Sequence, residues 1–145
     1  MGILSELHER WYGRPLPPPA TPMPFQSGGC PGPTSTLIGS TETVLVQQDL
    51  TGTGGKLLLT GGIQMAYQAA QGPLSVKLRL YRDGQLLAES LPHQVNSFCP
   101  AASIVLAAAD PIGIGRYTYT LRAVVVEGAL TYAWRPWLMW AEGRS

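Results

Sequence analysis

The stretch LSVKLRLYRDG, residues 74–84, decides the fold of this chain. Every second residue from Leu74 to Leu80 is aliphatic, and the residues between them are polar or amphipathic. This alternation is typical of a β-strand with one face in a core. Asp83-Gly84 is typical of a two-residue hairpin turn, and residues 85–91 are expected to form the second, antiparallel strand. The stretch therefore predicts an antiparallel hairpin.

Strand-like segments continue on both sides of this hairpin, separated by turns rich in glycine and proline. They cover residues 36–46, 56–68, 101–109, 116–127 and 130–140. One face of the second segment should carry Leu57, Leu59, Ile63, Met65 and Tyr67. About seven to eight antiparallel strands, with no convincing helix, predict an all-β domain over residues 36–145, either a jelly roll or another β-sandwich.

Residues 1–35 differ in composition and are expected to form an extended arm. Eight of the chain's 13 prolines lie between Arg14 and Pro33. Because proline fixes φ and lacks an N–H group, this stretch should run as polyproline II with a reach of roughly 60 Å. A short amphipathic helix over residues 3–12 is an option, and it would need a partner surface.

Bulky apolar side chains in the arm indicate that it binds a neighbouring subunit rather than serving as an inert linker. The expected contact residues are Leu4, Leu7, Trp11, Tyr12, Met23 and Phe25. Packing of the arm onto its own domain and disorder are the two alternatives.

The bulk composition excludes several classes of partner. With 10 basic and 9 acidic residues the chain has no basic excess, so nucleic-acid binding is not expected. No apolar run approaches the ~18 residues of a membrane span. The first residues do not resemble a signal peptide, so we expect a soluble protein that is not exported by the ordinary route. A hydrophobic fraction of 45% indicates apolar surface buried between subunits, or simply a compact β domain.

The residues that usually carry chemistry are scattered. His8 and His93 have no ligands at metal spacing, and the two cysteines, Cys30 and Cys99, form no CxxC motif. A His93–Cys99 nucleophile pair is conceivable, but a solvated loop explains both residues. Free thiols are expected, with a Cys30–Cys99 disulfide as the alternative. We predict no catalysis, no cofactor and no metal.

The acidic residues fall mostly at expected strand ends and turns. Asp83 precedes a glycine and Asp110 precedes a proline, so both are interpreted as turn residues. The glycine-rich stretch 51–55 lacks a following Lys-Ser pair and is interpreted as a turn rather than a phosphate-binding loop.

Aromatic residues gather in the last expected strand. The candidate subunit interface consists of Tyr132, Trp134, Arg135, Trp137 and Trp140. Trp137 has the opposite parity to the other two tryptophans, so one sheet face cannot hold all three unless Pro136 introduces a bulge. Alternatives are that Trp137 caps one end of the barrel, or that the aromatics bind a carbohydrate.

Four segments together resemble the small trimeric jelly rolls of the tumour-necrosis-factor-like kind: residues 40–44, 78–84, 110–111 and 117–123. Such domains occur in bacterial spore-surface proteins and in phage structural proteins. Within that group, the size, the proline-rich arm and the preference for arginine look like a capsid decoration (cement) protein of a long-tailed phage of thermophilic bacteria.

This resemblance implies homotrimers on the outside of a shell, with arms that clamp neighbouring subunits and the major capsid protein as partner. It also implies a location on the virion surface after assembly in the host cytoplasm. The alternatives are a spore-surface or appendage subunit, and a receptor- or glycan-binding fibre tip.

Overall fold

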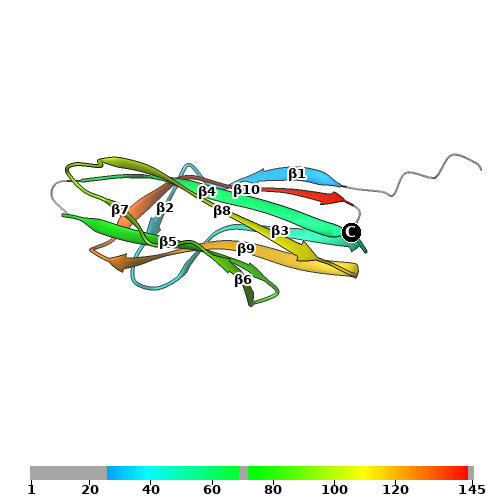
Figure 1. The fold of residues 1–145 in the computed structure, drawn as a ribbon. Helices are drawn as coiled ribbons and strands as arrows, with labels where there is room; N and C mark the ends of the chain where they lie inside the picture. Colours follow the sequence, from blue (N-terminus) through cyan, green and yellow to red (C-terminus); the bar gives the residue numbers. More distant parts are fainter. Residues whose placement is uncertain (1–25, 69–71, 144–145) are drawn as a thin grey trace, which may run out of the picture.

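The computed structural model describes residues 26–68 and 72–143 and shows two stacked β-sheets (Figure 1). Ten strands form two five-stranded sheets, and every strand pairing is antiparallel. The prediction of an all-β sandwich is confirmed. The expected helix over residues 3–12 and the six arm residues from Leu4 to Phe25 lie outside the described residues.

The first sheet, sheet A, has the order β1-β10-β4-β8, and β2 also pairs with β10. Its strands are β1 (Ser27–Pro31), β2 (Ser35–Ile38), β4 (Lys56–Ala66), β8 (Ala101–Pro111) and β10 (Thr131–Gly143). The second sheet, sheet B, has the order β3-β9-β5-β6, and β7 also pairs with β5. Its strands are β3 (Thr43–Thr53), β5 (Leu74–Arg82), β6 (Gln85–Glu89), β7 (His93–Val95) and β9 (Ile114–Glu127).

This order is that of a jelly roll. β1 and β2 both pair with β10, and β6 and β7 both pair with β5, so ten strands occupy eight positions in the two sheets. Apart from the β5–β6 hairpin, the neighbours within each sheet are not consecutive in sequence, which is the result of two Greek keys. The expected seven to eight strands differ from the observed ten because two of the positions are filled by interrupted strands.

The core lies between the sheets and consists of the inward residues of each alternating strand. Leu78 and Leu80 of β5 are fully buried, as the alternation in residues 74–82 predicts. Of the five residues expected on one face of β4, four are buried: Leu57, Leu59, Ile63 and Met65. Tyr67 follows the end of β4 and is partly buried against the core. Each such aliphatic side chain contributes roughly 1.5–3 kcal/mol to folding.

The predicted hairpin is present between β5 and β6. Asp83 and Gly84 both have positive φ, +48° and +82°, as a type I′ turn requires. Arg82 pairs with Gln85 across the turn. The Asp83 carboxylate accepts a hydrogen bond of 2.9 Å from the backbone N–H of Thr118, which ties the turn to β9.

The sandwich begins earlier than the expected boundary at residue 36. β1 lies inside the segment interpreted as arm and pairs with β10 from Ser27 to Pro31. This pairing is feasible because β1 is an edge strand with one neighbour. A proline has no N–H group to donate, and at the end of an edge strand no further strand needs that donor. The predicted strand 36–46 divides in two, since β2 belongs to sheet A and β3 to sheet B.

Asp110 is not the turn residue that the sequence suggested. β8 continues through Pro111, and Asp110 takes the next inward position of that strand, where it is buried. Its carboxylate accepts hydrogen bonds from Arg82 Nη1 at 2.6 Å and from the Tyr119 hydroxyl at 2.8 Å. Burial, followed by the hydrogen bond to Asp110, raises the pKa of Tyr119 well above its usual value. Both partners come from sheet B, so this cluster joins the two sheets.

The turn in the glycine-rich stretch is also shorter in the structure than the expected residues 51–55. β3 extends through Thr53, and only Gly54 and Gly55 connect it to β4. Gly54 has a φ of +92°, which favours glycine at the point where the chain reverses.

Candidate assembly surface

A β-bulge in β10 decides where the aromatic residues of that strand lie. The register between β10 and β4 shifts between Trp134 and Trp137, and Arg135 has a φ of +48°. Before the bulge the odd-numbered residues are buried, as at Ala133, and after it the even-numbered ones are buried, as at Leu138. The shift therefore places Trp134 and Trp137 on the same, outer face of sheet A.

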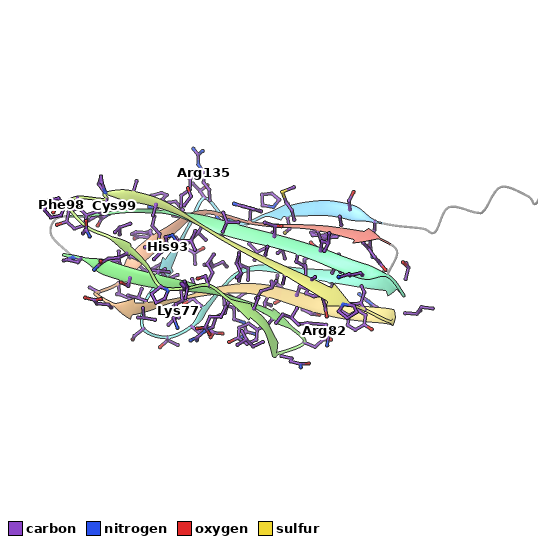
Figure 2. The ribbon with its side chains drawn as sticks, viewed as in Figure 1. Lys77, Arg82, His93, Phe98, Cys99 and Arg135 are labelled. Carbon is purple, nitrogen blue, oxygen red and sulfur yellow. The ribbon has the colours of Figure 1, made fainter. Side chains whose placement is uncertain are left out.

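The other candidate residues divide between the two faces. Tyr132 and Arg135 are exposed, and Figure 2 shows Arg135 projecting from the outer side of sheet A. Trp140 instead lies on the inner side, where it packs against the core. A Cβ atom at Gly28 would lie 2.7 Å from Trp140 Cζ2, so a glycine in β1 leaves room for this indole. The structure thus groups Trp140 with the core and the other four residues with the outer surface.

Trp137 packs over Gly62 of β4 on the outer side. It is half-buried, and a Cβ atom at Gly62 would lie 2.9 Å from its Cζ2 atom. Gly62 and Trp137 are direct cross-strand partners. The indole of Trp137 can therefore pack over Gly62 only because this residue has no side chain.

Antiparallel pairing aligns the outward residues of β10, β4 and β8 in rows across sheet A. The four rows are Trp134–Gln64–Ser103, Trp137–Gly62–Val105, Met139–Thr60–Ala107 and Ala141–Leu58–Ala109. We call these twelve residues the apolar face. None of them is charged, and Met139, Val105 and Leu58 are more than half exposed, at 57%, 56% and 55%. An exposed surface of this kind marks an interaction site more often than a solvated one.

Sequence reasoning found the tryptophans of the apolar face but missed Leu58 and Val105. Leu58 stands between two core leucines, Leu57 and Leu59, so a run of three leucines hid the one that points outward. The signal was available in β8, where the outward positions on either side of Val105 hold only alanine and serine.

The outer surface of sheet B has the opposite character. The Glu42 carboxylate accepts hydrogen bonds from Arg79 at 2.8 Å, from the Tyr81 hydroxyl at 2.8 Å and from Arg122 at 3.2 Å. Burial acts to raise the pKa of Glu42, but these three hydrogen bonds outweigh it and hold the pKa below its usual value. Glu89 accepts from Lys77 at 2.6 Å and from Arg79 at 3.1 Å. These five charged side chains are paired with one another and remain partly exposed to water.

A surface pocket of about 420 Å³ opens at one end of the apolar face. Its wall includes Gln64 and Ser103, which stand in one row with Trp134. The rings of Tyr132 and Trp134 lie 5.8 Å apart between centroids, with their planes tilted by 42°. Trp134 of β10 thus forms one side of the pocket, and β4 and β8 form the rest, where Gln64 and Ser103 are the two polar residues among methionine and alanines.

A buried carboxylate fixes the opposite end of β10. Glu142 accepts hydrogen bonds from the Thr53 backbone N–H at 2.8 Å, the Thr53 hydroxyl at 2.6 Å, the Gly55 N–H at 3.2 Å and Gln26 Nε2 at 2.8 Å. Burial acts to raise the pKa of Glu142. The hydrogen bonds together lower it by more, so the pKa lies below its usual value. The Gln26 amide also contacts the Thr51 carbonyl. This cluster anchors the point where residues 1–25 join the sandwich.

The described residues contain little that could carry catalysis. No three His, Cys, Asp or Glu side chains within residues 26–68 and 72–143 are placed to hold a metal ion. His93 and Cys99 are both exposed, and no hydrogen bond joins them (Figure 2). Cys30 and Cys99 are free thiols. None of the described segments forms a helix long and apolar enough to cross a membrane.

No protein-family model and no curated protein sequence matches this chain. Among solved structures, it resembles a chain of Bacillus endospore appendages, described as a family of disulfide-linked pili, with a TM-score of 0.46 and 12% identity over 83% of this chain and 89% of the other. It also resembles dimeric latent PorU from Porphyromonas gingivalis, with a TM-score of 0.45 and 11% identity over 86% of this chain and 13% of the other.

A third similar structure is that of infectious bursal disease virus, Gx strain, with a TM-score of 0.43 and 8% identity over 81% of this chain and 32% of the other. At these values the likeness identifies no family for this chain.

Proposed function

We propose that this protein is a non-catalytic structural subunit that assembles with copies of itself through the apolar face. The observation that carries the proposal is the contrast between the two outer surfaces of the sandwich. Sheet B pairs Glu42 and Glu89 with three cations, whereas the four rows of the apolar face hold no charge and Arg135 lies outside them at the β10 bulge. Depletion of charge together with tryptophan and methionine is the composition of a subunit interface.

The edge of sheet A supports the same proposal. β8 pairs with β4 alone, and its residues Ala101–Ala109 include neither a charge nor a proline. Natural proteins usually protect a long edge strand with such residues, because an unpaired edge invites pairing with another chain. An edge left without this protection is expected where a neighbouring subunit covers it.

In its most specific form, the proposal is that the subunits form homotrimers that decorate a phage capsid. The N-terminal arm, through Leu4, Leu7, Trp11, Tyr12, Met23 and Phe25, then binds neighbouring subunits or the major capsid protein. Several arms on each trimer would multiply individually modest contacts. Gln26 and Glu142 support this role by holding the root of the arm against the sandwich.

A glycan- or receptor-binding fibre tip is the second candidate, favoured by one observation. The exposed rings of Tyr132 and Trp134 stand beside a pocket that also presents Gln64 and Ser103, and aromatic rings with nearby polar groups can bind sugars. Titration of the purified protein with a glycan library, followed by tryptophan fluorescence, tests this candidate. Saturable binding that Trp134→Ala abolishes would favour it over assembly.

The assembly proposal is tested by placing a charge on each outer surface in turn. Val105→Asp puts a carboxylate in the middle of the apolar face, where Val105 is 56% exposed. The matched control is Val126→Asp, at a valine of sheet B that is 47% exposed. We expect Val105→Asp to yield monomers in light scattering after size exclusion, while Val126→Asp keeps the oligomeric mass. Unchanged mass in both variants would contradict the proposal.

A further inference from the structure

The pocket beside Tyr132 and Trp134 has the features of a groove that binds proline-rich segments. Such grooves present aromatic rings between which proline rings fit, together with donors that reach the backbone carbonyls of the ligand. Here the two rings are partly exposed, at 41% for Tyr132 and 37% for Trp134, and tilted against each other. The groove is therefore open to a ligand from solvent.

The polar groups of this pocket are suited to a ligand that can only accept hydrogen bonds. Gln64 and Ser103 line it next to Trp134, and each of the three side chains has an N–H or O–H to donate. Within residues 26–68 and 72–143, none of these three side chains makes a hydrogen bond. A proline-rich segment supplies carbonyl acceptors and, at each proline, no competing donor.

The chain itself carries such a segment. Residues 15–19 read Pro-Leu-Pro-Pro-Pro, and this run lies N-terminal to the first strand of the sandwich. Because proline fixes φ near its polyproline II value, a run of prolines loses little conformational entropy when it binds. Ligand and groove are thus both present in one polypeptide.

The direction of β1 favours a groove on another copy. β1 runs antiparallel to β10, with Ser27 opposite Ala141 and Pro31 opposite Trp137. Gln26, which precedes Ser27, therefore lies at the Glu142 end of β10 and not at the Trp134 end.

The length of the connecting chain favours the same conclusion. Trp134 and Glu142 are eight residues apart in β10, roughly 26 Å along a strand. For residues 15–19 to occupy the groove of their own copy, the chain between Pro19 and Gln26 would have to reverse at once and then run almost fully extended, because its seven steps span only about 22 Å in polyproline II. Pro22 and Pro24 stiffen the very residues where that reversal would have to occur.

From these observations we propose that residues 15–19 of one copy bind the groove of a neighbouring copy that Trp134, Gln64 and Ser103 line and that Tyr132 adjoins. This inference rests on the proposed self-assembly, and it specifies one contact that stabilises the assembly. It uses a stretch of the arm different from the six apolar residues expected to bind the shell. Each copy would then offer one segment and one groove, so that contacts can close into a ring.

A photo-crosslinking experiment in the full-length chain tests the contact. Leu16 is replaced by p-benzoylphenylalanine in a tagged chain that also carries Trp134→Phe, and this chain is co-expressed with the untagged wild type. Trp134→Phe keeps an aromatic ring in the groove. It also changes the mass of the peptide that contains residue 134, so mass spectrometry can tell the groove of the tagged chain from that of the wild type. We expect crosslinks to the wild-type peptide that contains Trp134. Crosslinks confined to the mass-marked peptide of the same chain, or to peptides outside the groove, would overturn the proposal.

Variants of both partners sharpen this test. Trp134→Ala in the untagged chain should lower the crosslink yield on the order of tenfold, while Leu86→Ala, at a leucine of β6 that is 47% exposed and lies outside the apolar face, should leave it unchanged. The double variant Pro17→Ala/Pro18→Ala should lower the yield similarly, whereas the control Pro92→Ala, at an exposed proline of the sandwich, should not. Equal yields in all four variants would contradict the assignment of the groove.

The co-purification step separates this inference from the proposed function. If the tagged chain does not retain the untagged one, self-assembly itself fails. If the two chains co-purify but the crosslink misses the groove, assembly stands and only the contact proposed here is rejected.

Discussion

Gln26, the first described residue, donates a hydrogen bond of 2.8 Å to the carboxylate of Glu142 near the end of β10. The same carboxylate accepts three further hydrogen bonds from Thr53 and Gly55 in the β3–β4 connection. One side chain thus joins the root of the arm, the last strand and a turn between the two sheets. An acidic residue is buried here because every bond it makes requires an acceptor.

We predict that Glu142→Gln destabilises the fold by about 1–3 kcal/mol, because the new amide turns an N–H group toward donors that need an acceptor. Chemical denaturation followed by tryptophan fluorescence measures this change. The exposed Glu127 provides the matched control, and Glu127→Gln should change the free energy of unfolding by less than about 0.5 kcal/mol. Equal effects of the two substitutions would be inconsistent with the role assigned to Glu142.

Acid should weaken the protein through Glu42 and Glu142. Both carboxyl groups have pKa values below the usual 4.5 in the folded chain, so their contribution is present in full above about pH 4.5. It is lost as the pH falls through the lower folded values. We expect the free energy of unfolding to decrease between pH 5 and pH 3, and the decrease to be smaller in Glu142→Gln. A variant with the same pH profile as the wild type would contradict this assignment.

Tyr119 should matter mainly through its hydroxyl group. Tyr119→Phe keeps the buried ring but leaves the Asp110 carboxylate with Arg82 as its remaining side-chain partner. We expect a loss of about 1–2 kcal/mol in the free energy of unfolding. Tyr117→Phe is a suitable comparison, because the Tyr117 hydroxyl makes a longer bond of 3.3 Å in an exposed position. A cost at Tyr117 as large as that at Tyr119 would count against the buried cluster.

Gly62 offers a test of the outer surface. In Gly62→Ala the new Cβ atom would lie 2.9 Å from Trp137 Cζ2 and 2.8 Å from the Ile104 carbonyl oxygen, so the indole has to move. We expect a shift in tryptophan emission and a weaker self-association of the protein. Gly143→Ala is the control, since nothing lies within 4 Å of a Cβ atom there. The explanation fails if both alanine variants leave emission and association unchanged.

The sequence predicted the fold well where alternation and turn chemistry agree, as in residues 74–84. It was less informative at β1, because the prolines around Ser27–Pro31 indicated an arm and only pairing with β10 shows an edge strand. Asp110 was misread because its sequence neighbour is a proline, while its real partners, Arg82 and Tyr119, come from strands distant in the chain. Local signals carry no information about such partners.

The candidate surface was predictable in part for a similar reason. The parity of the tryptophans in β10, together with Pro136, indicated that a bulge could bring them to one face, and the register shift is present. Which two tryptophans share the outer face depends on the position of the shift, which places Trp140 with the core. Leu58 and Val105 join Trp137 and Met139 only through the pairing of three strands, which no single segment reveals.

The most direct measurement is the mass of the full-length protein in solution, determined by sedimentation equilibrium over a wide concentration range. The chain has a mass of 15.6 kDa, and assembly through the apolar face predicts a multiple of that value, three times for a trimer. A single species of 15.6 kDa at every concentration would contradict the account.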